Sequence, residues 1–228
     1  MSNLNSEILA QRLEKVKNDI LSNCWDKNNP PSLVAVTKTV DANIINMLPP
    51  LGQIDIGENR AQSIVEKLPQ IDKKINIHYI GRLQTNKIKY IINDICLVHS
   101  LDRPRLADEL NKQALKSGLN IPVLVQVNIA QEAQKSGFEK NEAYSFIKKA
   151  KDYPALSIKG LMAMMPFIDD ELQLATYFKA MRNMFDDIRQ AAYPNVVMEH
   201  LSMGMTNDFK IAVSEGSTMV RVGSALFV

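Results

Sequence analysis

Lys38 stands just behind a short apolar run and is the residue in this sequence best placed to act as a nucleophile. The run Leu33–Val36 is typical of a buried strand, and Thr37 separates it from the lysine. A lysine amine attacks a carbonyl group only when it is neutral, and burial or a neighbouring cation favours that form. Held at a rigid strand end, Lys38 could therefore form a Schiff base with an aldehyde. The alternative is an ordinary surface lysine.

A possible anion-binding turn lies in "LSMGMTND", residues 201–208. Ser202 and Gly204 follow an apolar run, and Thr206 or Asn207 could cap a helix that begins directly afterwards. A hydroxyl group, a glycine that permits close approach and free amide groups at a helix start together form an anion site. The same residues could equally form a capped turn without a ligand.

A second such stretch ends the sequence, in "MVRVGSALFV" at residues 219–228. Arg221 interrupts an apolar pattern, and Gly223 and Ser224 follow it. In an eight-stranded parallel barrel the last strand closes against the first, so this segment would lie beside Lys38. An amine next to a phosphate-binding loop is the arrangement that a pyridoxal phosphate site requires. The alternative for Arg221 is an ion pair in the barrel wall.

Other polar stretches near strand ends have no spacing that assigns them a ligand. "HYIGRLQTNK", residues 78–87, could line the mouth of a site or form a loop and a helix start. The methionines of "GLMAMMPF", residues 160–167, are expected to fill the core. The sequence leaves open the roles of His78, Gln84, Asn86 and Lys135.

The elements that must position these residues alternate along the chain, as in a parallel α/β fold. Strands are predicted at residues 33–37, 53–57, 76–80, 95–99, 122–128, 157–162, 196–201 and 219–222. Helices, with apolar residues three and four apart, are expected within 58–68, 103–118, 139–152 and 169–190. No glycine-rich phosphate loop follows the first strand, which favours a single (β/α)8 TIM barrel over an open doubly wound sheet.

The N-terminal region is expected to add a helix outside the barrel. Its pattern is helical, and "NNPPS" at residues 28–32 breaks that pattern. We therefore predict one domain over residues 1–228, in which residues 1–30 contain the extra helix and residues 31–228 form the barrel.

Composition argues against several classes of protein. The 228 residues carry a net charge of +2, so neither nucleic acid nor an anionic membrane is indicated as a partner. No apolar run reaches the ~20 residues of a membrane helix, and the polar N-terminus does not resemble a targeting peptide. Two separated cysteines and three dispersed histidines indicate neither a disulfide framework nor a metal site. These features favour a cytoplasmic protein.

Several motifs together resemble the pyridoxal phosphate homeostasis protein family, single-domain relatives of the alanine racemase N-terminal barrel. The motifs are "VAVTKT", "IGENR", "HYIGRLQTNK", "HSLD", "VQVNIAQEAQKSGF", "GLMAMMPF" and "LSMGMTNDFKIAVSEGSTMVRVGSALF". They extend from Leu33 to Phe227, so the resemblance covers nearly the whole chain.

The resemblance implies a binding site for pyridoxal 5'-phosphate. The residues it implies are Lys38 as a covalent internal aldimine, Ser202, Gly223 and Ser224 at the phosphate group, Arg221 at the pyridine nitrogen and Asn59 near the ring. The chain departs from many relatives at Thr37, Arg82 and Ser224, but none of these changes removes a required functional group.

Two classes of function remain open within this resemblance. One is a protein that holds and delivers pyridoxal phosphate, in the homeostasis of vitamin B6 and of amino and keto acids, with apo-enzymes as recipients. The other is an amino-acid racemase or another weak enzyme that depends on this cofactor. A racemase needs acid–base groups on both faces of the cofactor, and the sequence ends at Val228 without the further domain that related racemases use to form dimers. An always-charged arginine at the pyridine nitrogen also disfavours carbanion chemistry. We therefore expect a monomeric cofactor-binding protein without robust catalytic activity.

Overall fold

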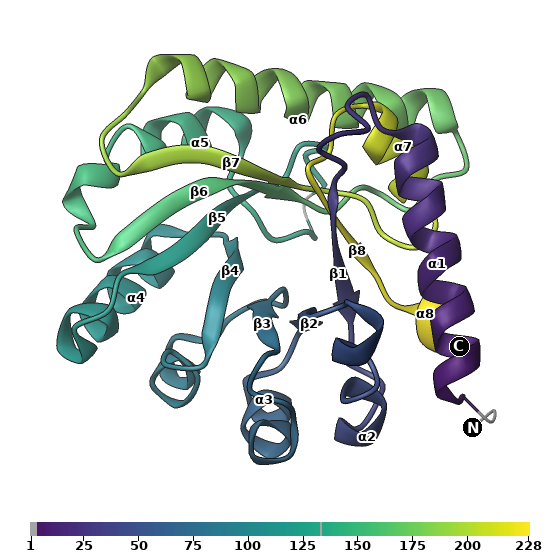
Figure 1. Ribbon diagram of the computed structural model, residues 1–228. Coiled ribbons are helices and arrows are strands. Elements are labelled where there is room, and N and C mark those ends of the chain that lie inside the picture. The colour runs from purple at the N-terminus through teal and green to yellow at the C-terminus, as the bar shows by residue number, and fades with distance from the viewer. Residues whose placement is uncertain (1–3, 133) are drawn as a thin grey trace.

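Eight parallel strands close into a barrel in the computed structural model, which describes residues 4–132 and 134–228 (Figure 1). Each strand pairs with its neighbours in sequence order, and the eighth pairs with the first. The strands are β1 (Ser32–Val36), β2 (Asp55–Glu58), β3 (Asn76–Tyr79), β4 (Ile95–Leu101), β5 (Ile121–Val127), β6 (Leu156–Ala163), β7 (Val196–Ser202) and β8 (Met219–Val222). The predicted (β/α)8 barrel is confirmed, and each predicted strand occurs where its apolar run stands.

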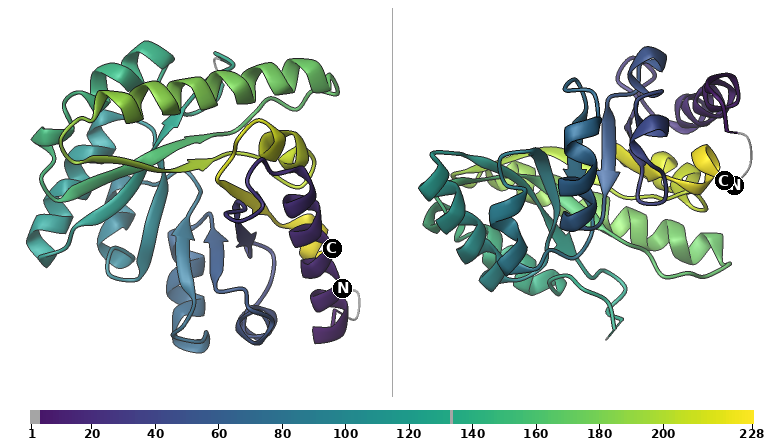
Figure 2. Two further views of the ribbon diagram at one scale, coloured as in Figure 1. Left: turned by 45° about the horizontal axis from the view of Figure 1, so that its top comes forward. Right: turned by 90° about the horizontal axis from the view of Figure 1, so that it is seen from below.

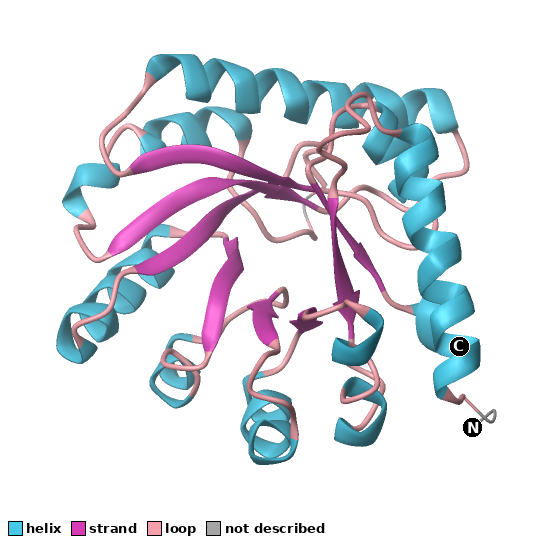
Figure 3. Cartoon of the chain, viewed as in Figure 1, coloured by secondary structure: helices cyan, strands magenta, loops and turns pink. Residues whose placement is uncertain are grey.

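Helices surround the barrel, as Figure 3 shows in cyan around the magenta strands. They are α1 (Ser6–Asn23), α2 (Ala42–Ile45), α3 (Ala61–Lys67), α4 (Pro104–Ser117), α5 (Lys140–Ile147), α6 (Glu171–Ala191), α7 (Phe209–Ser214) and α8 (Ser224–Phe227). Short 3-10 segments are η1 (Pro49–Leu51), η2 (Leu68–Gln70), η3 (Thr85–Tyr90) and η4 (Ala150–Asp152). Among the described residues, no helix is both long enough and apolar enough to cross a membrane.

Helix α1 packs on the barrel beside α7 and α8 (Figure 1, Figure 2). It buries Leu9, Leu13, Val16 and Ile20, which form one apolar stripe at helical spacing. Because α8 is a single turn, this side of the barrel would otherwise lack a long covering helix. The predicted extra helix is thus present, although it occupies only the middle of the predicted segment 1–30.

The barrel interior contains an apolar cluster with members on strands that are not neighbours. Strands β1 and β4 can meet only across the interior, so a cluster that includes both must fill it. Its members are Val34, Leu97, Leu124, Met162 and Met219. The larger apolar core, which includes the α1 stripe, packs helices against the outside of the strands.

The stretch 160–167 is only partly core, contrary to the prediction. Met162 and Met165 are buried, but Met164 is 42% exposed and Phe167 is 88% exposed. Strand β6 ends at Ala163, and the residues after it form a loop at the surface in which side chains no longer all face the core.

Candidate functional site

Lys38 lies in the turn that follows β1, and its side chain is exposed. Strand β1 pairs in parallel with β8, with Val34 opposite Arg221. The carboxyl ends of the two strands are therefore neighbours, and the turn at Gly223 lies next to the start of the Lys38 turn. A Cβ atom added at Gly223 would lie 3.2 Å from the carbonyl oxygen of Val36. The fold thus brings together the two segments that the sequence analysis predicted to be adjacent.

A buried ion pair anchors the residue before Lys38. Thr37 donates its hydroxyl hydrogen to Oε1 of Glu58 at 2.7 Å, and Lys67 donates from Nζ to the same oxygen at 2.6 Å. The Lys67 ammonium also donates to the backbone carbonyl of Thr37 at 2.9 Å. Glu58 is 1% exposed, so these charge-assisted contacts lie in a largely water-free environment. They fix the backbone at the start of the Lys38 turn, and nothing in the sequence indicated the contribution of Lys67.

Arg221 is almost fully buried, with 3% of its surface exposed. It donates from Nη1 to Oγ of Ser202 at 2.6 Å and from Nη2 to the carbonyl oxygen of Ala163 at 2.9 Å. Burial lowers the pKa of Arg221 to about 10, while the nearby carboxylate of Asp208 acts in the opposite direction. The guanidinium is therefore still a cation at neutral pH. Its hydrogen-bond partners are a hydroxyl and a carbonyl group, which is not the wall ion pair considered as the alternative.

Ser202 lies inside the barrel, and its position does not fit the expected role at a phosphate group. Its hydroxyl oxygen accepts the hydrogen bond from Arg221 and lies 3.0 Å from Nδ1 of His99. The residue is fully buried, so the hydroxyl is engaged on both sides by protein groups. Ser202 is the last residue of β7, so its side chain can face the barrel interior. The sequence pattern around it, a serine and a glycine after an apolar run, does not indicate this inward orientation.

Thr206 is a hydroxyl group near the predicted phosphate loop that the sequence analysis considered only as a helix cap. Its Oγ1 accepts a hydrogen bond from the backbone amide of Gly223 at 3.4 Å. Neither Thr206 nor Asn207 caps the following helix, because α7 begins at Phe209 with Asp208 as its N-cap residue. The carboxylate of Asp208 instead accepts from the amide of Met205 at 2.5 Å, which closes the turn after β7.

Two glycines allow the close backbone approaches that this end of the barrel requires. Gly204 has φ of +95°, and a Cβ atom there would lie 2.6 Å from the Cβ of Ala212. A Cβ atom on Gly81 would lie 2.2 Å from the carbonyl oxygen of Asn59. Asn59 itself follows β2 and is partly exposed. The loop after β3 thus packs directly on the loop that presents Asn59.

The residues whose roles the sequence left open occupy different parts of the fold. Gln84 and Asn86 are exposed at the start of η3, after β3. Lys135 forms an ion pair with Glu132 and donates to the carbonyl oxygen of Met165 at 3.0 Å, so it is not a freely solvated lysine. His78 points into the barrel, where its ring nitrogens lie within hydrogen-bonding distance of Asp55 and His99.

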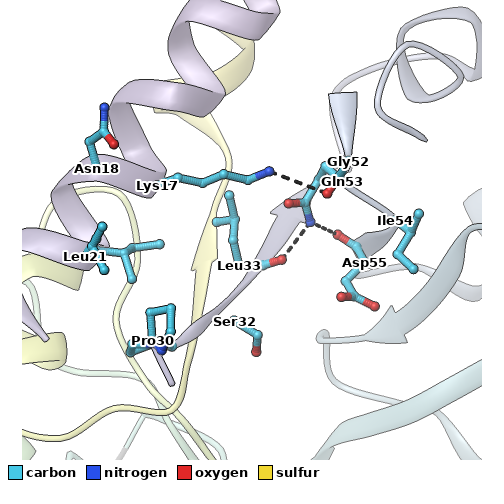
Figure 4. Close-up of a pocket in the computed structure, with 12 residues that line it drawn as sticks. Lys17, Asn18, Leu21, Pro30, Ser32, Leu33, Gly52, Gln53, Ile54 and Asp55 are labelled. Atoms are coloured by element: carbon cyan, nitrogen blue, oxygen red, sulfur yellow. Dashed lines mark hydrogen bonds between the residues drawn. The ribbon is translucent and has the colours of Figure 1, made fainter. Parts of the chain in front are cut away.

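A cavity of about 410 Å³ lies at the opposite, amino end of the barrel (Figure 4). It is bounded by α1, by residues 30–33 and by residues 52–55. Lys17 reaches across to the carbonyl oxygen of Gly52 at 3.4 Å, and Gln53 donates to the carbonyl oxygens of Leu33 and Asp55. None of the six predicted cofactor residues, all of which the structure describes, lines this cavity.

Metal ligands do not gather at either end of the described structure. Within residues 4–132 and 134–228 there is no group of three or more His, Cys, Asp or Glu side chains arranged to bind a metal ion. The chemistry available at the carboxyl end is therefore that of an amine, a buried guanidinium, hydroxyl groups and backbone amides.

Comparison with known proteins identifies relatives over nearly the full chain. Residues 26–228 match the family described as the N-terminal domain of alanine racemase. A pyridoxal phosphate homeostasis protein of Aquifex aeolicus is 37% identical over 222 residues, which is 96% of each chain.

Two solved structures have the same fold. The structure of PipY from Synechococcus elongatus PCC7942, with PLP bound, has a TM-score of 0.83 at 27% identity and covers 96% of this chain and 100% of that one. The crystal structure of an unknown protein from Bifidobacterium adolescentis has a TM-score of 0.93 at 28% identity and covers 100% and 97%.

Proposed function

We propose, since this chain belongs to the pyridoxal phosphate homeostasis protein family, that it binds pyridoxal 5'-phosphate at the carboxyl end of the barrel. Its role would be in the homeostasis of this form of vitamin B6 and of amino and keto acids. The observation that carries the proposal is the meeting of the Lys38 turn, the buried Arg221 and the Gly223 turn at the ends of β1 and β8. The likeness to PipY, whose structure has PLP bound, supports it.

The residues present fit such a cofactor. Arg221 uses two of its five N–H groups on described partners, so donors remain for a ring nitrogen. Gly223 passes close to β1, where a Cβ atom would lie only 3.2 Å from Val36, so the backbone of Gly223 and Ser224 lies next to the Lys38 turn. We propose that the Ser224 amide binds the phosphate group, joined by the Gly223 amide, which now donates over a long 3.4 Å to Thr206. We assign the accompanying hydroxyl to Thr206, and Ser202 to holding Arg221. Lys38 supplies the amine that would hold the cofactor covalently.

Asn59 is proposed to lie near the ring of the cofactor. Tyr79 donates from its hydroxyl to the carbonyl oxygen of Asn59 at 3.4 Å, and Gly81 packs against the same carbonyl group. These two contacts from the end of β3 would hold the Asn59 loop in place. Because only its backbone is engaged by them, the amide side chain is left to meet a ligand.

Robust catalysis is not part of the proposal. When bound, pyridoxal phosphate supplies an aldehyde and an electron-withdrawing ring. A guanidinium that stays charged at neutral pH can only donate to the ring nitrogen, which disfavours protonation of that nitrogen and weakens the ring as an electron sink. The second candidate, an amino-acid racemase, would be established by inversion of a free amino acid at ordinary enzymatic rates, and we expect that assay to show at most slow turnover.

The first experiment compares the visible absorption of the protein loaded with pyridoxal phosphate with that of a Lys38→Ala variant. We expect a yellow band in the wild type that is lost in the variant, and borohydride reduction should trap the cofactor mass on the peptide that contains Lys38. Lys73→Ala is the matched control, because Lys73 is exposed at the opposite end of the barrel and should leave the band unchanged. A wild-type protein that cannot be loaded would overturn the proposed function.

The proposal extends to partners, assembly and location. We propose a monomer that passes the cofactor to apo-enzymes in the cytoplasm, where Cys24 and Cys96 would stay as free thiols. Light scattering of the loaded protein would test the monomer, and restoration of activity to a cofactor-free enzyme by the loaded protein would test the transfer.

A further inference from the structure

Five polar side chains form a continuous hydrogen-bonded chain through the interior of the barrel, from Arg221 to Asp55. Arg221 contacts Oγ of Ser202 at 2.6 Å, and this oxygen lies 3.0 Å from Nδ1 of His99. Nε2 of His99 is 2.9 Å from Nδ1 of His78, and Nε2 of His78 is 3.3 Å from Oδ1 of Asp55. The members come from β8, β7, β4, β3 and β2. The hydrogen-bonded chain therefore extends from Asp55, at the amino end of β2, to Ser202 and Arg221, near the carboxyl ends of β7 and β8.

One set of proton positions, with both imidazoles neutral, agrees with the chemistry of the two ends. Arginine can only donate, so Ser202 accepts from Arg221 and has one hydroxyl proton left to donate to Nδ1 of His99. A carboxylate can only accept, so Nε2–H of His78 donates to Asp55. In its neutral form His78 then accepts at Nδ1, so the proton between the rings belongs to Nε2 of His99. All four bonds are satisfied when both imidazoles are neutral and carry their proton on Nε2.

Burial and charge agree with this arrangement. His99 is fully buried, and this burial is the main reason that its pKa lies well below the ordinary value, with the Arg221 cation acting in the same direction. The hydrogen bond from His78 is the largest of the effects that lower the pKa of Asp55, so this residue is a carboxylate at neutral pH. The hydrogen-bonded chain thus runs from a buried cation to a carboxylate through the two imidazole rings.

We propose that His99 and His78 are positioning residues that hold the guanidinium of Arg221 through Ser202 and link it to Asp55 at the amino-end cavity. We call these five hydrogen-bonded side chains, from Arg221 to Asp55, the relay. The Asp55 side chain is 33% exposed and lies in the wall of that cavity, so this end of the relay is in contact with solvent. The link from Arg221 to the cofactor rests on the proposed function. The relay itself does not, and it can be tested in protein without cofactor.

The test uses long-range ¹H–¹⁵N NMR on the cofactor-free protein at pH 7. The protein contains three histidines, so His99→Asn and His78→Gln variants assign the NMR signals of the two rings. We expect both rings to be neutral Nε2–H tautomers. An Nδ1–H tautomer or an imidazolium at His99 would overturn the proposal, whether or not the protein binds pyridoxal phosphate.

A second readout follows the side-chain N–H protons of Arg221, assigned with an Arg221→Lys variant. Breaking the relay with His99→Ala should speed their exchange with water about tenfold or more, because hydrogen bonds to charged groups are among the stronger ones. His99→Asn, which keeps an acceptor for the Ser202 hydroxyl, should restore much of the protection. Equal exchange in wild type and His99→Ala would show that the histidines do not hold Arg221.

The last comparison separates the relay from the cofactor assignment. Asp55→Ala should shift the ¹⁵N signals of His78 and His99, whereas Asp152→Ala, which removes an exposed carboxylate, should leave them unchanged. In the loaded protein Asp55→Ala should also shift the cofactor absorption band. If the NMR signals shift but the absorption band does not, the relay exists but Arg221 does not contact the cofactor. If neither the signals nor the band shifts, no relay exists.

Discussion

His99 is enclosed between His78 and Ser202, and this position decides its protonation. Removing the ring from water disfavours its charged form, which is the main reason that its pKa falls well below 6.5. The nearby His200 is shifted in the same direction, again mainly by burial. Both groups therefore make the stability of the fold depend on pH.

The free energy of unfolding should fall as the pH drops below about 6.5, the ordinary histidine value. In this range the unfolded chain takes up protons on His99 and His200 that the folded protein does not. The slope is up to about 1.4 kcal/mol per pH unit for His99 and smaller for His200, whose side chain is 35% exposed and screened by water. The loss from each ring levels off once the pH passes its lowered folded pKa. Urea titrations between pH 7 and 5 should show this slope, and His99→Asn should reduce it. An unchanged slope in the variant would contradict the assignment.

Asp55 extends the acid sensitivity to lower pH. Its folded pKa lies below the ordinary 3.8, so its stabilising contribution is complete above that value and is lost as the pH falls through the folded pKa.

Gly81 should control the position of Asn59, because any side chain there collides with the Asn59 carbonyl oxygen. We expect Gly81→Ala to cost about 1–3 kcal/mol of stability and to weaken cofactor binding by moving the Asn59 loop. Gly118→Ala is the control. Gly118 has φ of +65° but open space around it, so the change should cost stability without altering cofactor affinity. Equal affinity of the two variants would argue against a role for Asn59.

At the scale of the elements, α3 is joined to the ends of β1 and β2 by a polar contact near the site. Lys67 is on the last turn of α3, Glu58 ends β2, and Thr37 follows β1. Because Lys67 donates both to the Glu58 carboxylate and to the Thr37 backbone, three elements meet at one ammonium group. The turn that carries Lys38 depends on this junction.

Removing one partner of this pair should be costly, since it leaves a buried charge without compensation. We expect Lys67→Met to lower the free energy of unfolding by about 3 kcal/mol, toward the lower end for buried pairs because Lys67 retains 17% exposure. Glu58→Gln/Lys67→Met, which removes the charge but keeps an acceptor for Thr37, should recover most of the loss. Denaturant titrations measure both, and a double variant as unstable as Lys67→Met would refute the explanation.

At the scale of the whole molecule, α1 and the segment directly after it contact the C-terminal part of the barrel, from α6 to α8. The indole of Trp25 donates to the carbonyl oxygen of Ser214 and lies under the guanidinium of Arg182, at 5.5 Å from the ring centroid. A side chain at Gly216 would collide with the indole ring. Nearer the start of α1, Arg12 donates to the carbonyl oxygen of Leu226 at 3.1 Å.

We therefore expect α1 and the barrel to unfold together. Trp25 is the only tryptophan of the chain, so its fluorescence reports on this contact alone. In a urea titration its transition should coincide with that of the circular dichroism signal, which follows the helices and strands. A fluorescence transition at clearly lower urea would mean that α1 detaches before the barrel unfolds, and would contradict a single domain over residues 1–228.

The sequence by itself determined the barrel and the place of Lys38 at the end of its first strand. Strand and helix patterns are local, because they depend on the spacing of apolar residues within one segment, and eight such alternations leave few architectures. Gly118 is a further local case, since it ends α4 with the positive φ that glycine adopts readily.

Only the tertiary structure decided which polar groups meet. Ser202 is the last residue of β7, and its side chain turns inward to Arg221 and to His99, which lies 103 residues away in sequence. Glu58 and Lys67, like Asp55 and His78, are paired by strands and helices packed around a closed barrel. No local pattern encodes such pairs, because the partners are chosen by strand register and by the need to satisfy every buried donor and acceptor.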